Sequence, residues 1–136
     1  MATFVKFHAF IEAVAEKKHD LGADVLMIAL TNTLPVQATA AVLTDITEIA
    51  YTNLSARTVT RTSSAQTGGV YKLVLADLVL TASGPVAPFR YAVLYNNTAA
   101  AKDLINFWDY GSVVTMGNLE TFTVDMDPSA GVLTLA

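Results

Sequence analysis

Two histidines are the residues with the most obvious potential for acid–base chemistry or metal binding. His8 and His19 are the only histidines, and they lie eleven positions apart in a segment with a helical pattern. On one helix they would share a face but lie about 16 Å apart along the axis, too far to share one metal ion. No carboxylate or nucleophile accompanies either at a recognisable catalytic spacing. We therefore expect His8 at the boundary of an apolar stripe and His19 as a C-terminal cap.

A pair of aspartates offers a second possibility. Asp125 and Asp127 would lie on one face of a strand, about 6.5–7 Å apart. Paired carboxylates serve glycoside hydrolysis or bind calcium. Nothing around this pair supports either role, so we interpret it as a solvated strand end that leads into a proline turn. For Asp109, between Trp108 and Tyr110, we expect a hydrogen-bonded structural role.

Aromatic and glycine-rich stretches complete the search for a site. Trp108, Tyr91 and Tyr95 could form a platform on which sugars stack, although such clusters are usually core. The Gly68-Gly69 pair has no following helix start or lysine, so it is not a phosphate-binding loop. The sequence thus predicts no catalytic residues, no cofactor and no metal site, and we do not expect an enzyme.

Composition narrows the class of protein. Hydrophobic residues make up 53% and charged residues only 15%, against a usual quarter charged. Either the chain is a tightly packed all-β domain with a threonine-rich surface, or another protein covers part of it. There is no cysteine, which excludes disulfides and thiol chemistry.

Charge and hydropathy also limit the partners. The net charge is −4, and Lys17-Lys18 is the only adjacent basic pair, so we expect no direct contact with nucleic acid. No apolar run is long enough for a membrane span. The first residues lack the basic-then-apolar layout of a secretory signal. We expect the protein to stay where it is made or to travel as part of an assembly.

The stretch from Pro88 to Gly111 predicts the centre of the fold. Its first half alternates, so that Phe89, Tyr91, Val93 and Tyr95 would share one face of a strand. Residues 104–110 have the same β-forming bias, and residues 96–103 between them are small or polar. We predict two central antiparallel strands joined by a loop.

The N-terminal residues 3–21 have the pattern of an amphipathic helix. Apolar residues recur at steps of three and four, and Thr3 and Gly22 suit its two ends. The predicted stripe contains Phe4, Phe7, Phe10, Ile11 and Val14. The helix would cover an open side of a sheet, because its polar face mixes both signs of charge, unlike a membrane-surface helix.

The remaining segments predict further strands separated by turns. They are a doubly buried strand at 25–30, one or two helical turns at 44–50, an exposed or edge strand at 57–63, a turn at 66–69, a long strand at 70–81 interrupted at Ala76-Asp77, a half-buried strand at 120–127 and a closing strand at 132–136. About seven or eight strands and one helix predict a mainly β fold. We expect a single domain, residues 1–136, with the architecture of a jelly-roll-like antiparallel β-sandwich carrying one N-terminal α-helix.

Four stretches together resemble a known family. They are PFRYAVLYNNT, LINFWDYGS, ETFTVDMDPSAGVLTLA and the opening segment that leads to VLMIALTNTLPV. With these the chain is similar to head-decoration, or cement, proteins of tailed bacteriophages. The resemblance implies a jelly-roll-like virion protein, assembled in the host cytoplasm, that binds the outside of the major capsid protein shell. It also implies a homo-oligomer that bridges capsomers, and we favour a dimer over a trimer. The alternative is another virion component, such as a tail part or a surface carbohydrate-binding module.

For a decoration protein, the contacts with the shell should come from exposed elements. We expect them in the segment 34–56, the loop 96–103 and the N-terminal helix. The candidate contact residues are Leu34, Pro35, Val36, Leu43, Arg57, Arg61, Asn97 and Lys102.

Overall fold

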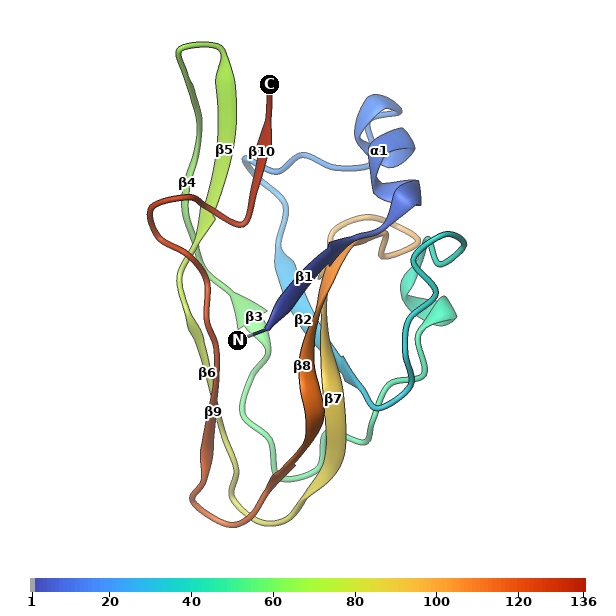
Figure 1. The fold of residues 1–136 in the computed structure, drawn as a ribbon, viewed down its shortest axis with the longest axis vertical. Coiled ribbons are helices and arrows are strands. Elements are labelled where there is room, and N and C mark those ends of the chain that lie inside the picture. Colours follow the sequence, from blue (N-terminus) through green and yellow to red (C-terminus); the bar gives the residue numbers. More distant parts are fainter. Residues whose placement is uncertain (1) are drawn as a thin grey trace.

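The chain forms two layers of antiparallel strands with one short helix at an end (Figure 1). The structure is a computed structural model and describes residues 2–136. One layer is a five-stranded sheet in the order β1-β8-β7-β2-β3, and the other contains β10-β5-β4 and the pair β6-β9. The elements are β1 (Thr3–Lys6), α1 (His8–Ala15), β2 (Leu26–Thr31), the 3₁₀ turn η1 (Leu43–Asp45), β3 (Thr58–Val59), β4 (Arg61–Thr67), β5 (Val70–Leu75), β6 (Leu78–Thr81), β7 (Val86–Asn96), β8 (Leu104–Met116), β9 (Thr121–Val124) and β10 (Leu133–Leu135).

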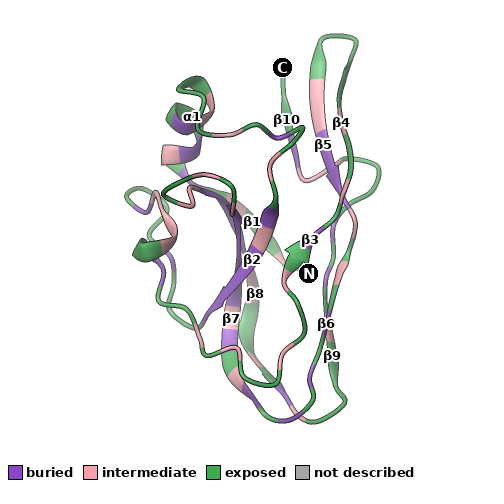
Figure 2. Ribbon diagram, turned by 180° about the vertical axis from the view of Figure 1, so that it is seen from behind, coloured by how far each residue is buried: buried purple, intermediate pink, exposed green. Residues whose placement is uncertain are grey.

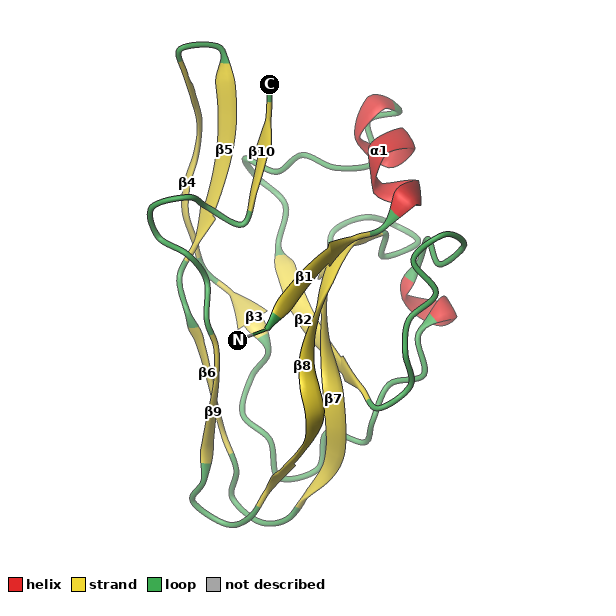
Figure 3. Cartoon of the chain, viewed as in Figure 1, coloured by secondary structure: helices red, strands yellow, loops and turns green. Residues whose placement is uncertain are grey.

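The predicted fold class, a mainly β antiparallel sandwich with one helix, is confirmed (Figure 3). The strand prediction was close: the long strand divides at Ala76-Asp77 into β5 and β6, and β2, β9 and β10 lie where the pattern placed them. In residues 2–136 no helix is long and apolar enough to cross a membrane.

The central hairpin is the pair β7–β8, as predicted. β7 lies between β8 and β2, and Val93 stands opposite Phe107 on one side and Ala29 on the other. Residues 91–96 are all buried, because β7 is covered on both faces (Figure 2). A strand in this position needs apolar side chains in both directions, which explains the nearly continuous apolar run.

A large irregularity interrupts the β7–β8 ladder near Gly111. Tyr91 stands opposite Asp109, but Phe89 stands opposite Val114, so the four residues 110–113 of β8 face Arg90 alone, three more than in a regular ladder. Gly111 has φ +81°, which glycine adopts without strain. The two sides of this bulge have different aromatic partners. On one side Phe89 packs on Phe122 of β9, and on the other Tyr91 packs on Phe107 of β8.

The prediction of one helix over residues 3–21 is wrong. Residues 3–6 form the edge strand β1, paired with β8, and the helix covers only His8–Ala15. Thr3 is therefore not a cap. A helix this short has little stability of its own, whereas pairing with β8 gives β1 a full ladder of hydrogen bonds. Phe7 and Phe10 are buried as expected, but Ile11 of the predicted stripe is 57% exposed.

The C-terminus of α1 also differs from the prediction. Lys17 has φ +63°, and the Lys18 N–H donates to the Ala13 carbonyl, which is a Schellman motif. Gly22 is thus not the end of the helix, and His19 lies beyond it and is not its cap. His8 is exposed at the first helical position.

The segment 32–56 begins against the five-stranded sheet, on the side away from the second layer, and its residues 53–55 then bond residues 81–83 at the end of β6 (Figure 1). Tyr51 fastens it: its hydroxyl accepts the Leu30 N–H at 3.0 Å and donates to Glu48 at 2.6 Å. Burial, followed by the bond to Glu48, raises the pKa of Tyr51. Arg57 stacks on the Tyr51 ring at 3.6 Å. The segment is therefore an ordered cover, although only η1 within it is helical.

Candidate functional site

A groove of about 530 Å³ runs beside the edge strand β1, and we call it the apolar groove. The sheet provides one wall, with Val5 of β1 and Phe107 of β8. The loop 34–38 provides the other wall, where Leu34 is 60% and Val36 is 58% exposed. Three of the predicted contact residues, Leu34, Pro35 and Val36, therefore lie on one concave and mostly apolar surface.

The loop that holds Leu34 and Val36 is fastened to β1 by Gln37. The Gln37 side-chain amide donates to the Lys6 carbonyl at 2.8 Å, and the Gln37 carbonyl accepts the His8 N–H at 3.2 Å. Pro35, between these two residues in the loop, is buried. Two apolar side chains are thus held in solvent by a loop that is itself anchored.

The apolar groove also borders the open edge of the sheet. The Phe7 N–H bonds the Ile105 carbonyl of β8, so alternate residues of β1 bond β8. The backbone groups of Phe4 and Lys6 consequently point away from β8, and Gln37 takes only the Lys6 carbonyl. An unpaired edge with an apolar groove beside it is suited to an extended segment of another chain.

Asp109 lies on the floor of the apolar groove but is fully engaged. Arg90 donates to both carboxylate oxygens, at 2.9 and 3.2 Å, and the Gly111 N–H donates at 2.8 Å. The Arg90 bond, followed by the Gly111 bond, lowers the pKa of Asp109. This confirms the predicted hydrogen-bonded role, and it leaves Asp109 ionised and unsuited to act as a proton donor near neutral pH.

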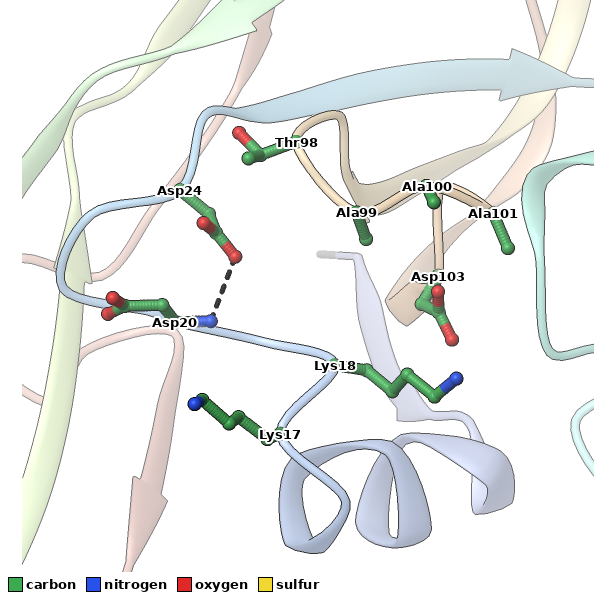
Figure 4. A pocket seen from close by; sticks show the side chains of 9 residues that line it. All are labelled: Lys17, Lys18, Asp20, Asp24, Thr98, Ala99, Ala100, Ala101 and Asp103. Carbon is green, nitrogen blue, oxygen red and sulfur yellow. Dashed lines mark hydrogen bonds between the residues drawn. The ribbon is translucent and has the colours of Figure 1, made fainter.

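A second hollow, of about 380 Å³, lies between the α1–β2 connection and the β7–β8 loop (Figure 4). We call it the polar pocket. It mixes signs of charge, and in Figure 4 the Lys18 amine extends toward Asp103. The charged residues that line it are Lys17, Lys18, Asp20, Asp24 and Asp103. Across residues 2–136 no group of three or more histidine, cysteine, aspartate or glutamate side chains is arranged to hold a metal ion.

Asn96 organises the wall of the polar pocket. It is fully buried, and its Nδ2 bonds Asp24 Oδ2 at 2.6 Å and His19 Nδ1 at 3.1 Å. Its Oδ1 accepts the N–H groups of Thr98 and Ala99 at 2.9 and 3.1 Å. We call Asn96, Asp24 and His19 the polar junction, because their bonds join the α1–β2 connection to the β7–β8 loop.

The other predicted contact residues are largely occupied within the chain. Arg57 donates to the Ile28 carbonyl at 2.6 Å and Arg61 to the Asp24 carbonyl at 2.9 Å. The Lys102 Nζ donates to both the backbone carbonyl and the side-chain Oδ1 of Asn97. These four half-buried side chains brace loops and strands, so their contact with a partner stays a prediction.

Leu43 joins two segments that the sequence predicts as separate contact regions. Its N–H donates to the Lys102 carbonyl at 3.0 Å, and Val42 bridges Asp103. The structure therefore brings the segment 34–56 and the loop 96–103 together at one end of the sheet. The Leu43 side chain is half-buried.

Leu119 is an exposed apolar residue that sequence reasoning missed. It is 79% exposed and has φ +66°, a conformation that favours glycine or asparagine. Its N–H bonds the Ala82 carbonyl, and Glu120 Oε1 accepts the Gly117 N–H, so the turn is fixed. The signal in the sequence is one leucine in the otherwise polar stretch Gly-Asn-Leu-Glu. The β8–β9 turn lies at the opposite end of the molecule from α1 (Figure 1).

The remaining residues singled out for chemistry have structural roles. Asp127 Oδ1 accepts the N–H groups of Ser129 and Ala130, and Asp125 and Asp127 are exposed beyond the end of β9, which confirms the solvated turn. The aromatic residues of the suggested sugar platform are buried, with exposures of 7% for Trp108, 6% for Tyr91 and 3% for Tyr95. They belong to the core.

Comparison with protein-family models, with curated proteins and with solved structures gives no match to this chain. The exposed apolar residues and the sequence resemblance described above are therefore the features that bear on function. Of the two hollows, the apolar groove offers exposed apolar side chains, whereas the polar pocket is lined by charged side chains of both signs and by small residues.

Proposed function

We propose that this chain is a structural protein of a tailed-bacteriophage virion. It binds the outside of the assembled major capsid shell and stabilises it, as a homodimer that bridges neighbouring capsomers. The sequence resemblance to decoration proteins motivates the proposal. The observation that carries it is the exposure of Leu34 and Val36 at the apolar groove beside the open edge of β1.

The apolar groove supplies the means of attachment. Covering Leu34 and Val36 with another protein would remove apolar surface from water, which is favourable by about 25 cal/mol per Å². Because Gln37 fastens the loop to β1, little additional ordering would accompany binding. An extended segment of the capsid protein could also pair with the free backbone groups of β1.

Leu119 supports a bridging role. A protein that joins two capsomers needs two contact surfaces, and the linked contacts strengthen each other. Leu119 projects from the β8–β9 turn, apart from the apolar groove and in a fixed turn. We therefore assign the apolar groove to one capsomer contact and Leu119 to a second.

Stabilisation of the shell would follow from mass action. A ligand that binds the assembled shell but not its separated subunits shifts the equilibrium toward assembly. Many copies with modest individual affinity then make the particle resistant to disruption. No chemical step is involved in this function.

The test is binding of the purified chain to heads that lack it. We expect co-sedimentation at a fixed, high copy number, density on the outer surface in electron micrographs, and heads that survive heating better with the protein bound. Leu34→Ser combined with Val36→Ser should weaken binding at least tenfold. Val79→Ser is the matched control, because Val79 is 53% exposed on β6, and it should bind normally.

Three results would contradict the proposal. They are absence of the protein from purified virions, a few copies per particle as for a tail component, and unchanged binding by the groove variant. Sedimentation equilibrium of the free chain tests the dimer separately, since a monomer would overturn that part alone.

A further inference from the structure

His19 is a half-buried histidine that the proposed function does not use. It lies on the α1–β2 connection, its ring centroid is 5.2 Å from that of Phe10, and its Nδ1 is 3.1 Å from Asn96 Nδ2. Its other nitrogen, Nε2, is buried and has no hydrogen-bond partner among residues 2–136. One hydrogen bond and one aromatic contact thus hold the ring.

The hydrogen bonds of Asn96 determine which nitrogen of His19 carries the proton. Asn96 Oδ1 accepts two backbone N–H groups, from Thr98 and Ala99, so the orientation of its amide is fixed. One Nδ2 hydrogen goes to Asp24 and the other points to His19 Nδ1. Nδ1 must therefore accept, and the neutral ring carries its proton on Nε2.

We propose that His19 is an acid-sensitive latch between the α1–β2 connection and the β7–β8 loop. A second proton on the ring would reside on Nδ1, where it would face the Nδ2 hydrogen of Asn96. Asn96 cannot rotate its amide without breaking the hydrogen bonds that its Oδ1 accepts from the Thr98 and Ala99 N–H groups. The ring leaves instead, and the latch opens. This inference does not rest on the proposed function.

The surroundings of the ring leave room for this movement. A hollow of about 470 Å³ adjoins His19 on the side of the β4–β5 hairpin, where Tyr71 and Ser64 bond each other. On the other side lies the polar pocket, with Asp24 and Asp103. The remaining charged groups that line these two hollows are Lys17, Lys18 and Asp20. An imidazolium that leaves Asn96 would find carboxylates nearby.

Burial and the nearby carboxylates shift the pKa of His19 in opposite directions, and the larger effect decides whether acid opens or closes the latch. Burial lowers the pKa of His19 below its ordinary value of 6.5, and the opposing effects of Asp103 and Asp24 are smaller. The open or unfolded chain therefore binds the proton more readily than the closed one. The closing bond is fully present above about pH 6.5 and is lost as the pH falls through the lower, folded-state pKa.

The test uses the full chain labelled with ¹⁵N. At pH 7.5, imidazole spectra should show His19 neutral with its proton on Nε2. As the pH falls from 6.5 to 5, exchange of the Ala23 and Asp24 amides, which bond the Asp20 carbonyl beside His19 in the α1–β2 connection, should accelerate after correction for intrinsic rates by up to about tenfold per pH unit, the limit for one linked proton. Amides of β7 and β8 at the centre of the sheet should not change.

Two variants separate the latch from general acid effects. His19→Phe keeps an aromatic ring but cannot titrate, so the acceleration should disappear. His8→Gln removes the exposed histidine, and the acceleration of exchange should remain in this variant. A proton on Nδ1 at pH 7.5, exchange independent of pH, or acceleration that persists in His19→Phe would each overturn the latch. The first two measurements use the unmodified protein, so they decide even if the variant does not fold.

Discussion

The polar junction and the apolar groove both form where distant segments meet the five-stranded sheet, yet they differ in the burial and hydrogen bonding of their side chains. At the polar junction, Asn96 bonds groups from two separate segments and is fully buried. At the apolar groove, Leu34 and Val36 remain in solvent although the loop that carries them is fixed. In the first region the Asn96 amide has its hydrogen-bond partners within the chain, whereas the second region leaves apolar surface uncovered.

This difference separates stability from association. A buried polar side chain with several bonds is costly to remove, because its former partners are left without bonds. An exposed apolar side chain contributes little to folding, because it is equally wet in the unfolded chain. Substitutions at the polar junction should therefore change the free energy of unfolding, and substitutions at the apolar groove should change binding.

The largest effect is expected at Asn96. Asn96→Ala removes bonds to Asp24, His19, Thr98 and Ala99, and should lower the free energy of unfolding by about 3 kcal/mol. Urea denaturation measures the change. Asn97→Ala is the matched control: Asn97 is only half-buried and bonds Lys102, so its loss should be about 0.5 kcal/mol. Equal losses for the two variants would show that the polar junction does not hold the loops.

A second buried asparagine, Asn106, sharpens the comparison, because its side-chain amide lacks the hydrogen-bond partners that Asn96 has. Asn106 is fully buried in β8, and neither its Oδ1 nor its Nδ2 has a hydrogen-bond partner within residues 2–136. Asn106→Leu, which has a similar shape, should raise the free energy of unfolding by about 1 kcal/mol, because it removes an unsatisfied buried amide. Calorimetry measures the shift. A destabilised Asn106→Leu would mean that the amide is satisfied by bound water.

A smaller effect on folding is expected at the apolar groove. Leu34→Ser combined with Val36→Ser should change the free energy of unfolding by no more than about 0.5 kcal/mol. The same urea titration as for Asn96 gives this value, alongside the binding loss expected above. A loss of several kcal/mol would show that these side chains serve the fold, and the comparison between the two regions would fail.

The smallest effect concerns Leu119. Asparagine tolerates φ values near +66° better than leucine does, so Leu119→Asn should leave stability unchanged or raise it by a few tenths of a kcal/mol. Shell binding should nevertheless weaken in the sedimentation assay. Unimpaired binding would remove Leu119 from the proposed bridge and leave the apolar groove as the one assigned contact.

Local patterns predicted the strands well where the side chains themselves determine burial. The alternation before Asn96 and the apolar run before Thr31 identified β7 and β2, and Gly68-Gly69, with φ +59° and +84°, makes the two-residue β4–β5 hairpin turn. The same reasoning failed at residues 3–6. A helical period there was overruled by pairing with β8, a partner about a hundred residues away.

The candidate site was predicted only in part. Leu34 and Val36 were correctly expected to be exposed, because they follow a turn signal after a buried strand. Arg57 and Arg61 are likewise predicted to be exposed contact residues, but each donates to a backbone carbonyl of another segment. A long charged side chain gives no local indication of which carbonyl it will reach.

The sequence by itself determined a mainly β chain with a central hairpin and a surface poor in charge, since side-chain period and composition act locally and survive any arrangement of the strands. Only the tertiary structure decided that residues 3–6 form an edge strand, that Asn96 binds His19 and Asp24, and that the Asn106 side chain has no hydrogen-bond partner among residues 2–136. These features depend on which distant segments become neighbours. Hydrogen bonds act only at contact distance, so no pattern along the chain encodes them.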